Sequence, residues 1–90
     1  MTEITLLTQE DCRLCDQAKN VLERIRAEYR LTITQLDLTS EQGKALAVEA
    51  TVMFAPGVLL DGKPFSFGRL SERKLRKALA EKPQMTQDRK

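Results

Sequence analysis

The spacing of apolar and polar residues changes along the first half of the chain. Residues 4–8 are mostly apolar or β-branched and alternate loosely, which favours a strand. Apolar residues then recur three and four positions apart, which predicts an amphipathic helix of about four turns. These residues are Leu14, Ala18, Val21, Leu22, Ile25 and Tyr29. Residues 31–38 form a second predicted strand, so the segment predicts a βαβ unit with parallel strands and a right-handed crossover.

The second half of the chain predicts a helix, a hairpin and a final helix. Residues 40–50 favour a short helix capped by Ser40, although Gly43 inside it weakens the helical pattern. Two apolar runs, residues 58–60 and 65–67, flank an Asp-Gly turn and predict a hairpin, with Pro64 placing its second strand at the sheet edge. Ser71 caps a last helix over residues 72–81. The order βαβ-α-ββα predicts an α/β fold: a four-stranded mixed sheet with helices on both faces.

Length and composition place the chain among single-domain globular proteins. It has 90 residues, of which 41% are hydrophobic and 31% charged, so we expect one domain over residues 1–82 and a polar tail over residues 83–90. No apolar run approaches the roughly 20 residues that a membrane-spanning helix needs. The first ten residues lack the basic and apolar regions of a secretory signal. We therefore expect a cytoplasmic protein in a reducing compartment.

The formal net charge of +2 is unevenly distributed. Residues 1–68 contain seven Lys or Arg and ten Asp or Glu, whereas residues 69–90 contain eight and three. A basic final helix could contact an acidic partner or nucleic acid, but a solvated helix face explains the same pattern. We expect a monomer that binds neither membranes nor nucleic acid.

The only two cysteines are Cys12 and Cys15. A disulfide between them would close a very short loop and would restrict the unfolded chain little, so stability is a poor explanation for the pair. In a cytosolic protein, redox chemistry or metal binding explains a Cys-x-x-Cys motif better.

The position of the motif favours redox chemistry. Cys12 lies where the first strand leads into the first helix, with Asp11 as the expected N-cap. Free backbone N–H groups and the helix dipole lower the pKa of a thiol there, and Arg13 adds a cation, whereas Glu10 and Asp11 oppose the effect. Cys15 falls one turn later beside the apolar stripe, within bridging range of Cys12.

The expected reaction is thiol–disulfide exchange. Cys12 would attack a substrate disulfide as the thiolate, and Cys15 would resolve the mixed disulfide. The chain contains no histidine, which excludes chemistry of the Cys–His type.

Several segments together resemble a glutaredoxin. They are the Cys-x-x-Cys motif at a βα junction, the order of elements, and the stretch Val52-Met53-Phe54-Ala55-Pro56 that leads into Val58-Leu59-Leu60-Asp61-Gly62. The stretch from Phe65 to Leu79, including Phe67-Gly68-Arg69-Leu70-Ser71, is more similar to small bacterial glutaredoxin-like proteins. The resemblance covers roughly residues 3–81 and implies the thioredoxin fold.

The resemblance also implies substrate-binding residues. It implies that Pro56 follows a cis peptide bond and that the backbone of Ala55 pairs with a bound peptide or glutathione. Arg13-Leu14 replaces the usual Pro-Tyr between the cysteines, and the segment that holds the glutathione carboxylate is absent. Its nearest counterpart offers Arg69 and the helix start at Ser71. The implied substrates are protein disulfides or glutathione, with glutathione as a co-substrate, no bound cofactor and a separate reductase.

Two other functions fit the same cysteine pair. A Cys-x-x-Cys motif after a first strand also binds Cu(I) in metal carriers, but those domains end in a strand, whereas this chain is predicted to end in a helix. We therefore predict no metal site. A thioredoxin-fold binding module or redox sensor without turnover would contain the same pair and remains an alternative.

Overall fold

A computed structural model describes residues 2–81 of the protein. It contains β1 (Thr2–Thr8), α1 (Arg13–Arg26), β2 (Leu31–Asp37), α2 (Glu41–Ala50), β3 (Gly57–Leu60), β4 (Lys63–Phe67) and α3 (Glu72–Glu81). The predicted order of elements is confirmed. The predicted polar tail, residues 83–90, lies outside the described residues.

The four strands form one mixed sheet in the order β2-β1-β3-β4. β1 pairs parallel with β2, from Thr2 opposite Leu31 to Thr8 opposite Asp37. β3 pairs antiparallel with both β1 and β4. β4 therefore lies at the sheet edge, as Pro64 predicts.

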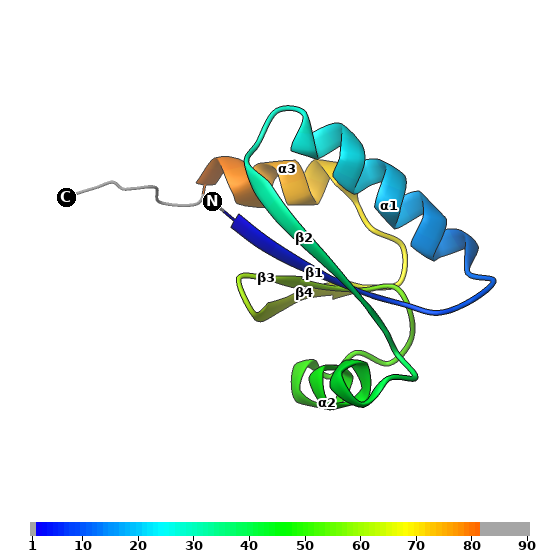
Figure 1. The fold of residues 1–90 in the computed structure, drawn as a ribbon. Coiled ribbons are helices and arrows are strands. Elements are labelled where there is room, and N and C mark those ends of the chain that lie inside the picture. The colour runs from blue at the N-terminus through cyan, green and yellow to red at the C-terminus, as the bar shows by residue number, and fades with distance from the viewer. Residues whose placement is uncertain (1, 82–90) are drawn as a thin grey trace.

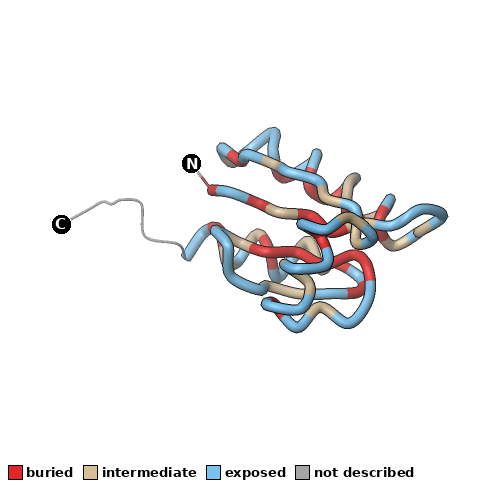
Figure 2. The backbone as a smooth tube through the Cα atoms, turned by 60° about the horizontal axis from the view of Figure 1, so that its bottom comes forward, coloured by how far each residue is buried: buried red, intermediate tan, exposed pale blue. Residues whose placement is uncertain are grey.

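Helices cover both faces of the sheet, with α1 and α3 on one side and α2 on the other (Figure 1). The larger core cluster joins α1 and α3 to the sheet through buried residues that include Ile4, Leu6, Leu22, Val58 and Leu75. The smaller cluster lies under α2 and includes Leu7, Ala50 and Leu59. Buried residues, red in Figure 2, accordingly concentrate along β1 and β3 and recur at intervals along α1.

The first helix ends earlier than its apolar spacing predicts. α1 ends at Arg26, so Tyr29 lies in the following turn, where it still packs against the core. The backbone N–H groups of Glu28 and Tyr29 both donate to the carbonyl oxygen of Ile25. A tight turn with these bonds returns the chain directly into β2 and keeps the tyrosine at the core without a further helical turn.

None of the helices within residues 2–81 is long and apolar enough to cross a membrane.

A carboxylate at the start of α3 connects the two helices on the same face. Glu72 accepts hydrogen bonds from Arg24 of α1 at 2.8 and 3.1 Å and from Arg76 of α3 at 3.0 Å. Arg76 also pairs with Glu28 at 2.9 Å. The bond from Arg24, and then that from Arg76, lowers the pKa of Glu72 below its ordinary value of 4.5.

We expect Glu72→Gln to lower the melting temperature at neutral pH by no more than about 5 °C, because these ion pairs are partly exposed to solvent. A carboxyl group with a lowered pKa in the folded state stabilises the protein above its unfolded-state pKa. That stabilisation is lost as the pH falls through the folded-state pKa, which lies below 4.5. Thermal melts at neutral and acidic pH should therefore differ between variant and wild type only at the higher pH. Glu23→Gln is the matched control, since Glu23 pairs with Arg26 on its own helix. An equal effect from both variants would contradict a bridge between α1 and α3.

Candidate active site

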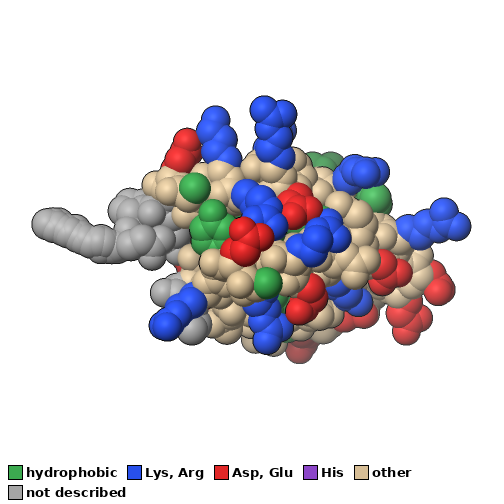
Figure 3. Space-filling model, turned by 90° about the horizontal axis from the view of Figure 1, so that it is seen from above, with side chains coloured by type: hydrophobic (Ala, Val, Ile, Leu, Met, Phe, Trp, Pro, Cys, Tyr) green, Lys and Arg blue, Asp and Glu red, His purple; other side chains and the backbone are tan. Residues whose placement is uncertain are grey.

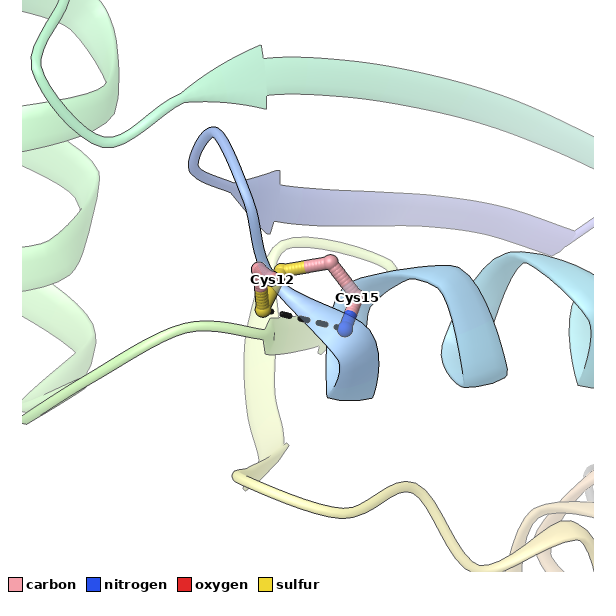
Figure 4. The surroundings of a disulfide bond; sticks show 2 residues. All are labelled: Cys12 and Cys15. Atoms are coloured by element: carbon pink, nitrogen blue, oxygen red, sulfur yellow. Dashed lines mark hydrogen bonds between the residues drawn. A yellow bond between two sulfur atoms is a disulfide. The ribbon is translucent and has the colours of Figure 1, made fainter.

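Cys12 and Cys15 lie at the junction between the loop after β1 and the first turn of α1 (Figure 4). A disulfide joins them, with 5.1 Å between their Cα atoms, within the usual range for bridged cysteines. The prediction that a spacing of three brings the two sulfurs within bridging range is confirmed.

Cys12 is itself the N-cap of α1, so the prediction of Asp11 as the cap is wrong. The backbone of Cys12 is extended, with φ −116° and ψ 105°, and its Sγ accepts a hydrogen bond from the Cys15 N–H at 3.0 Å. Asp11 precedes it with φ 53°, a left-handed conformation that Asp tolerates in turns. An N-cap residue typically has an extended backbone, so the positive φ of Asp11 does not fit that position.

The two cysteines differ in their exposure to solvent. Cys15 is 1% exposed and faces the core together with Ala18 and Leu22, one and two turns further along α1. Cys12 is only half-buried. An incoming sulfur atom can therefore reach Cys12 from solvent but not Cys15.

The Ala55–Pro56 segment leads directly into β3. Its peptide bond is cis, so the conformation that the resemblance implies is confirmed. Both side chains are buried. Gly57, the next residue, pairs with Leu7 near the end of β1, and the carbonyl oxygen of Pro56 accepts a bond from the Gly68 N–H.

The other predicted substrate-binding residues lie at separate positions. Arg13 is exposed at the start of α1, beside Cys12. Arg69 is exposed in the turn before α3, and the Ser71 hydroxyl accepts a bond from the Lys74 N–H at 3.2 Å, which confirms it as a helix cap. Gln17 connects α1 to this turn by donating to the carbonyl oxygen of Leu70 at 3.1 Å.

An open cleft of about 580 Å³ lies beside Cys12, and we call it the Cys12 cleft. Of the predicted site residues, only Cys12 and Arg13 line it; Ala55, Pro56, Arg69 and Ser71 do not. Its charged residues are Glu10, Asp11, Asp16, Asp37, Arg13 and Lys19.

Asp16 and Asp37 were not predicted to lie in this cleft. Asp16 lies one helical turn after Cys12, on the same side of α1. Asp37 ends β2 opposite Thr8, the last residue of β1. The carboxyl ends of adjacent parallel strands meet at one sheet edge, and this rule is the signal that could have placed Asp37 near the motif.

The Asp37 carboxylate is held in its charged form. The hydroxyl and the backbone N–H of Thr39 both donate to it, and these two bonds lower its pKa below the ordinary value. Within residues 2–81, no group of three or more His, Cys, Asp or Glu side chains is arranged to hold a metal ion.

Two exposed aromatic side chains lie close to the Ala55–Pro56 segment. Phe54 is 53% exposed and Phe67 is 42% exposed, and their rings meet edge to face with centroids 5.1 Å apart. Phe54 immediately precedes Ala55, and Phe67 pairs with Gly57. Apolar surface of this kind is typical of sites that contact a polypeptide.

Comparison with known proteins places the fold and the family. The structure is similar to a mutant thioredoxin from Halobacterium salinarum NRC-1, with a TM-score of 0.67 and 20% sequence identity over 87% of this chain and 71% of that one. It is also similar to an uncharacterised thioredoxin-like protein from Clostridium perfringens, with a TM-score of 0.73 and 17% identity over 89% of this chain and 69% of that one. No curated protein matches the sequence.

The likeness to these structures confirms the predicted thioredoxin-like α/β fold. A family model for the glutaredoxin-like domain (DUF836) matches residues 3–80. The match covers nearly all of the described chain, including the cysteine pair, the Ala55–Pro56 segment and the cap of α3. The chain therefore belongs to the glutaredoxin-like domain family.

Proposed function

We propose that this protein is a thiol–disulfide oxidoreductase that reduces disulfides by a dithiol mechanism. The observation that carries the proposal is the asymmetry of its cysteine pair, in which a half-buried Cys12 caps α1 and bonds to a fully buried Cys15. In such a pair, one sulfur is accessible to a substrate disulfide, and the other is shielded from solvent and can resolve the mixed disulfide.

The reaction begins with the reduced protein. The Cys12 thiolate attacks one sulfur of a substrate disulfide, forms a mixed disulfide and expels the other substrate sulfur as a thiolate. Cys15, as the thiolate, then attacks Cys12 and releases the second substrate thiolate. Two electrons pass to the substrate, and the Cys12–Cys15 disulfide remains. A separate dithiol reductant restores the reduced protein.

The start of α1 supports the assignment of Cys12 as the attacking residue. The first N–H groups of a helix have no intrahelical partner and stabilise an adjacent thiolate, which lowers the pKa of the thiol. In the present structure the Cys15 N–H already donates to Cys12 Sγ. Arg13 adds a positive charge beside it.

The resemblance to glutaredoxins implies the substrate-binding residues of this proposal. The backbone of Ala55 would pair with an extended substrate beside Pro56, in the manner of an added strand. Arg69 and the helix start at Ser71 would hold a carboxylate, which is the group that glutathione offers. Protein disulfides and glutathione mixed disulfides are therefore both candidate substrates, and glutathione is a candidate co-substrate. We place this activity in the reducing cytoplasm, in a monomer that holds no cofactor.

A turnover assay tests the proposal. On mild oxidation, mass spectrometry should show that a single chain loses the mass of two hydrogens. Reduction should restore that mass. With an excess of an external dithiol, it should accelerate the reduction of a protein disulfide or of a glutathione mixed disulfide above the uncatalysed rate. Reversible oxidation without turnover would instead support a redox sensor. Intermolecular dimers alone, or no oxidation, would rule out the dithiol mechanism.

The exposed aromatic pair gives a second test of the site. We expect Phe54→Ala to slow the reduction of a protein disulfide by about fivefold, because a polypeptide substrate would bury part of this ring. The rate with a small disulfide such as hydroxyethyl disulfide should change less than about twofold, since that substrate has no side chain to contact the ring. Val48→Ala is the control, because Val48 is 82% exposed on α2 and does not line the Cys12 cleft. An equal loss with both substrates would show that Phe54 only supports the fold.

A further inference from the structure

The Cys12 cleft adjoins the accessible cysteine of the disulfide. Cys12 lines the cleft, and Cys15 behind it is 1% exposed. On the proposed function, a substrate disulfide that exchanges with Cys12 brings its own flanking residues close to this cleft. The charges around the cleft can therefore discriminate between substrates.

These charges are predominantly negative. Four carboxylates line the cleft against two cations, a formal surplus of two negative charges: Glu10, Asp11, Asp16 and Asp37 against Arg13 and Lys19. The end of the molecule formed by the β1–α1 loop accordingly displays grouped acidic side chains, whereas charges of both signs alternate over α1 and α3 (Figure 3).

None of these carboxylates forms an ion pair with another residue of the 2–81 range. Within residues 2–81, all four ion pairs join residues outside the cleft. Asp37 bonds to Thr39, and the lowered pKa of its carboxyl group keeps it charged. At physiological salt, charges interact over about 8 Å, so these groups act on the residues next to a bound disulfide.

We propose that the Cys12 cleft selects polypeptide disulfides flanked by Lys or Arg and disfavours anionic ones. This inference rests on the proposed function and names its substrate class. A cationic flank would increase the rate of encounter and stabilise the mixed disulfide, whereas an anionic flank would be repelled. Glutathione contains two carboxylates and one ammonium group, and therefore belongs to the disfavoured class.

Two peptide disulfides test the charge preference. They share one sequence and differ only in carrying Lys or Glu on either side of the bridge. Each is mixed with the reduced protein, quenched with acid and separated by chromatography. Rates with dithiothreitol, a neutral dithiol, correct for the intrinsic reactivity of each peptide. We expect the Lys peptide to react about tenfold faster at low salt. The difference should fall below about twofold in 1 M salt, where the screening length is about 3 Å.

Charge-neutral variants link the preference to the cleft. Glu10→Gln combined with Asp16→Asn should reduce the tenfold preference to about threefold or less at low salt. Glu49→Gln removes an exposed carboxylate of α2 outside the cleft and should leave the preference unchanged. Equal corrected rates in the wild type, or a preference that the double variant retains, would overturn the inference but not the proposed function. Failure to reduce either peptide would overturn the inference. The proposed function would be overturned as well only if the protein also failed to reduce a glutathione mixed disulfide.

Discussion

Replacing Cys15 with serine is expected to turn a transient complex into a stable one. In the Cys15→Ser variant, the Cys12 thiolate can still attack a substrate disulfide, but no second thiol lies within reach to resolve the product. Mixed disulfides should therefore accumulate at Cys12, and turnover with a dithiol reductant should fall to near the uncatalysed rate. Non-reducing electrophoresis followed by peptide mass spectrometry measures both the adduct and its position.

The reciprocal variant is the control for this experiment. Cys12→Ser should abolish attack and trap nothing, because the remaining sulfur is buried. Serine is a favoured N-cap residue, so the variant should keep the start of α1 intact. In the reduced wild type near neutral pH, Cys12 should alkylate at least about tenfold faster than Cys15, since only Cys12 is accessible and lies at the helix start. Faster alkylation of Cys15 would contradict the assigned roles.

A single methyl group at Gly43 is expected to destabilise the fold, although it should favour a helix. Alanine in place of glycine inside a helix normally adds about 1 kcal/mol of stability. Here a Cβ atom on Gly43 would overlap the backbone carbonyl oxygen of Asp37 and lie 3.0 Å from the Ser40 hydroxyl. Backbone atoms cannot rotate away as a side chain can, and overpacking of this kind typically costs about 1–3 kcal/mol or more.

We therefore expect Gly43→Ala to lower the free energy of unfolding by about 2 kcal/mol, or the melting temperature by about 10 °C. Chemical and thermal denaturation measure the effect. Gln42→Ala is the matched control, since Gln42 is exposed on the same turn and its substitution should be neutral or slightly stabilising. If Gly43→Ala were as stable as Gln42→Ala, the close approach of α2 to Asp37 would be wrong.

The elements and their order could be predicted from the sequence because their signals are local. Helical and alternating spacing placed the helices and strands, Ser40 and Ser71 placed two helix starts, and Asp61-Gly62 placed the hairpin turn. The cysteine pair could be placed at the start of the first helix for the same reason. Residues three positions apart at a helix start lie close enough for a disulfide, whatever the rest of the chain does.

The tertiary structure decided the features that depend on residues distant in sequence. Only the pairing of β1 with β2 brings Asp37 to the Cys12 cleft, and only the packing of α2 against the end of β2 explains why its first turn contains Gly43. The start of α1 is another feature that local sequence preferences do not determine. Asp11 has a suitable cap side chain, but the turn from the sheet gives it a positive φ and leaves the cap position to Cys12. Local preferences therefore determined which elements form, whereas contacts between elements determined which charges surround the reactive sulfur.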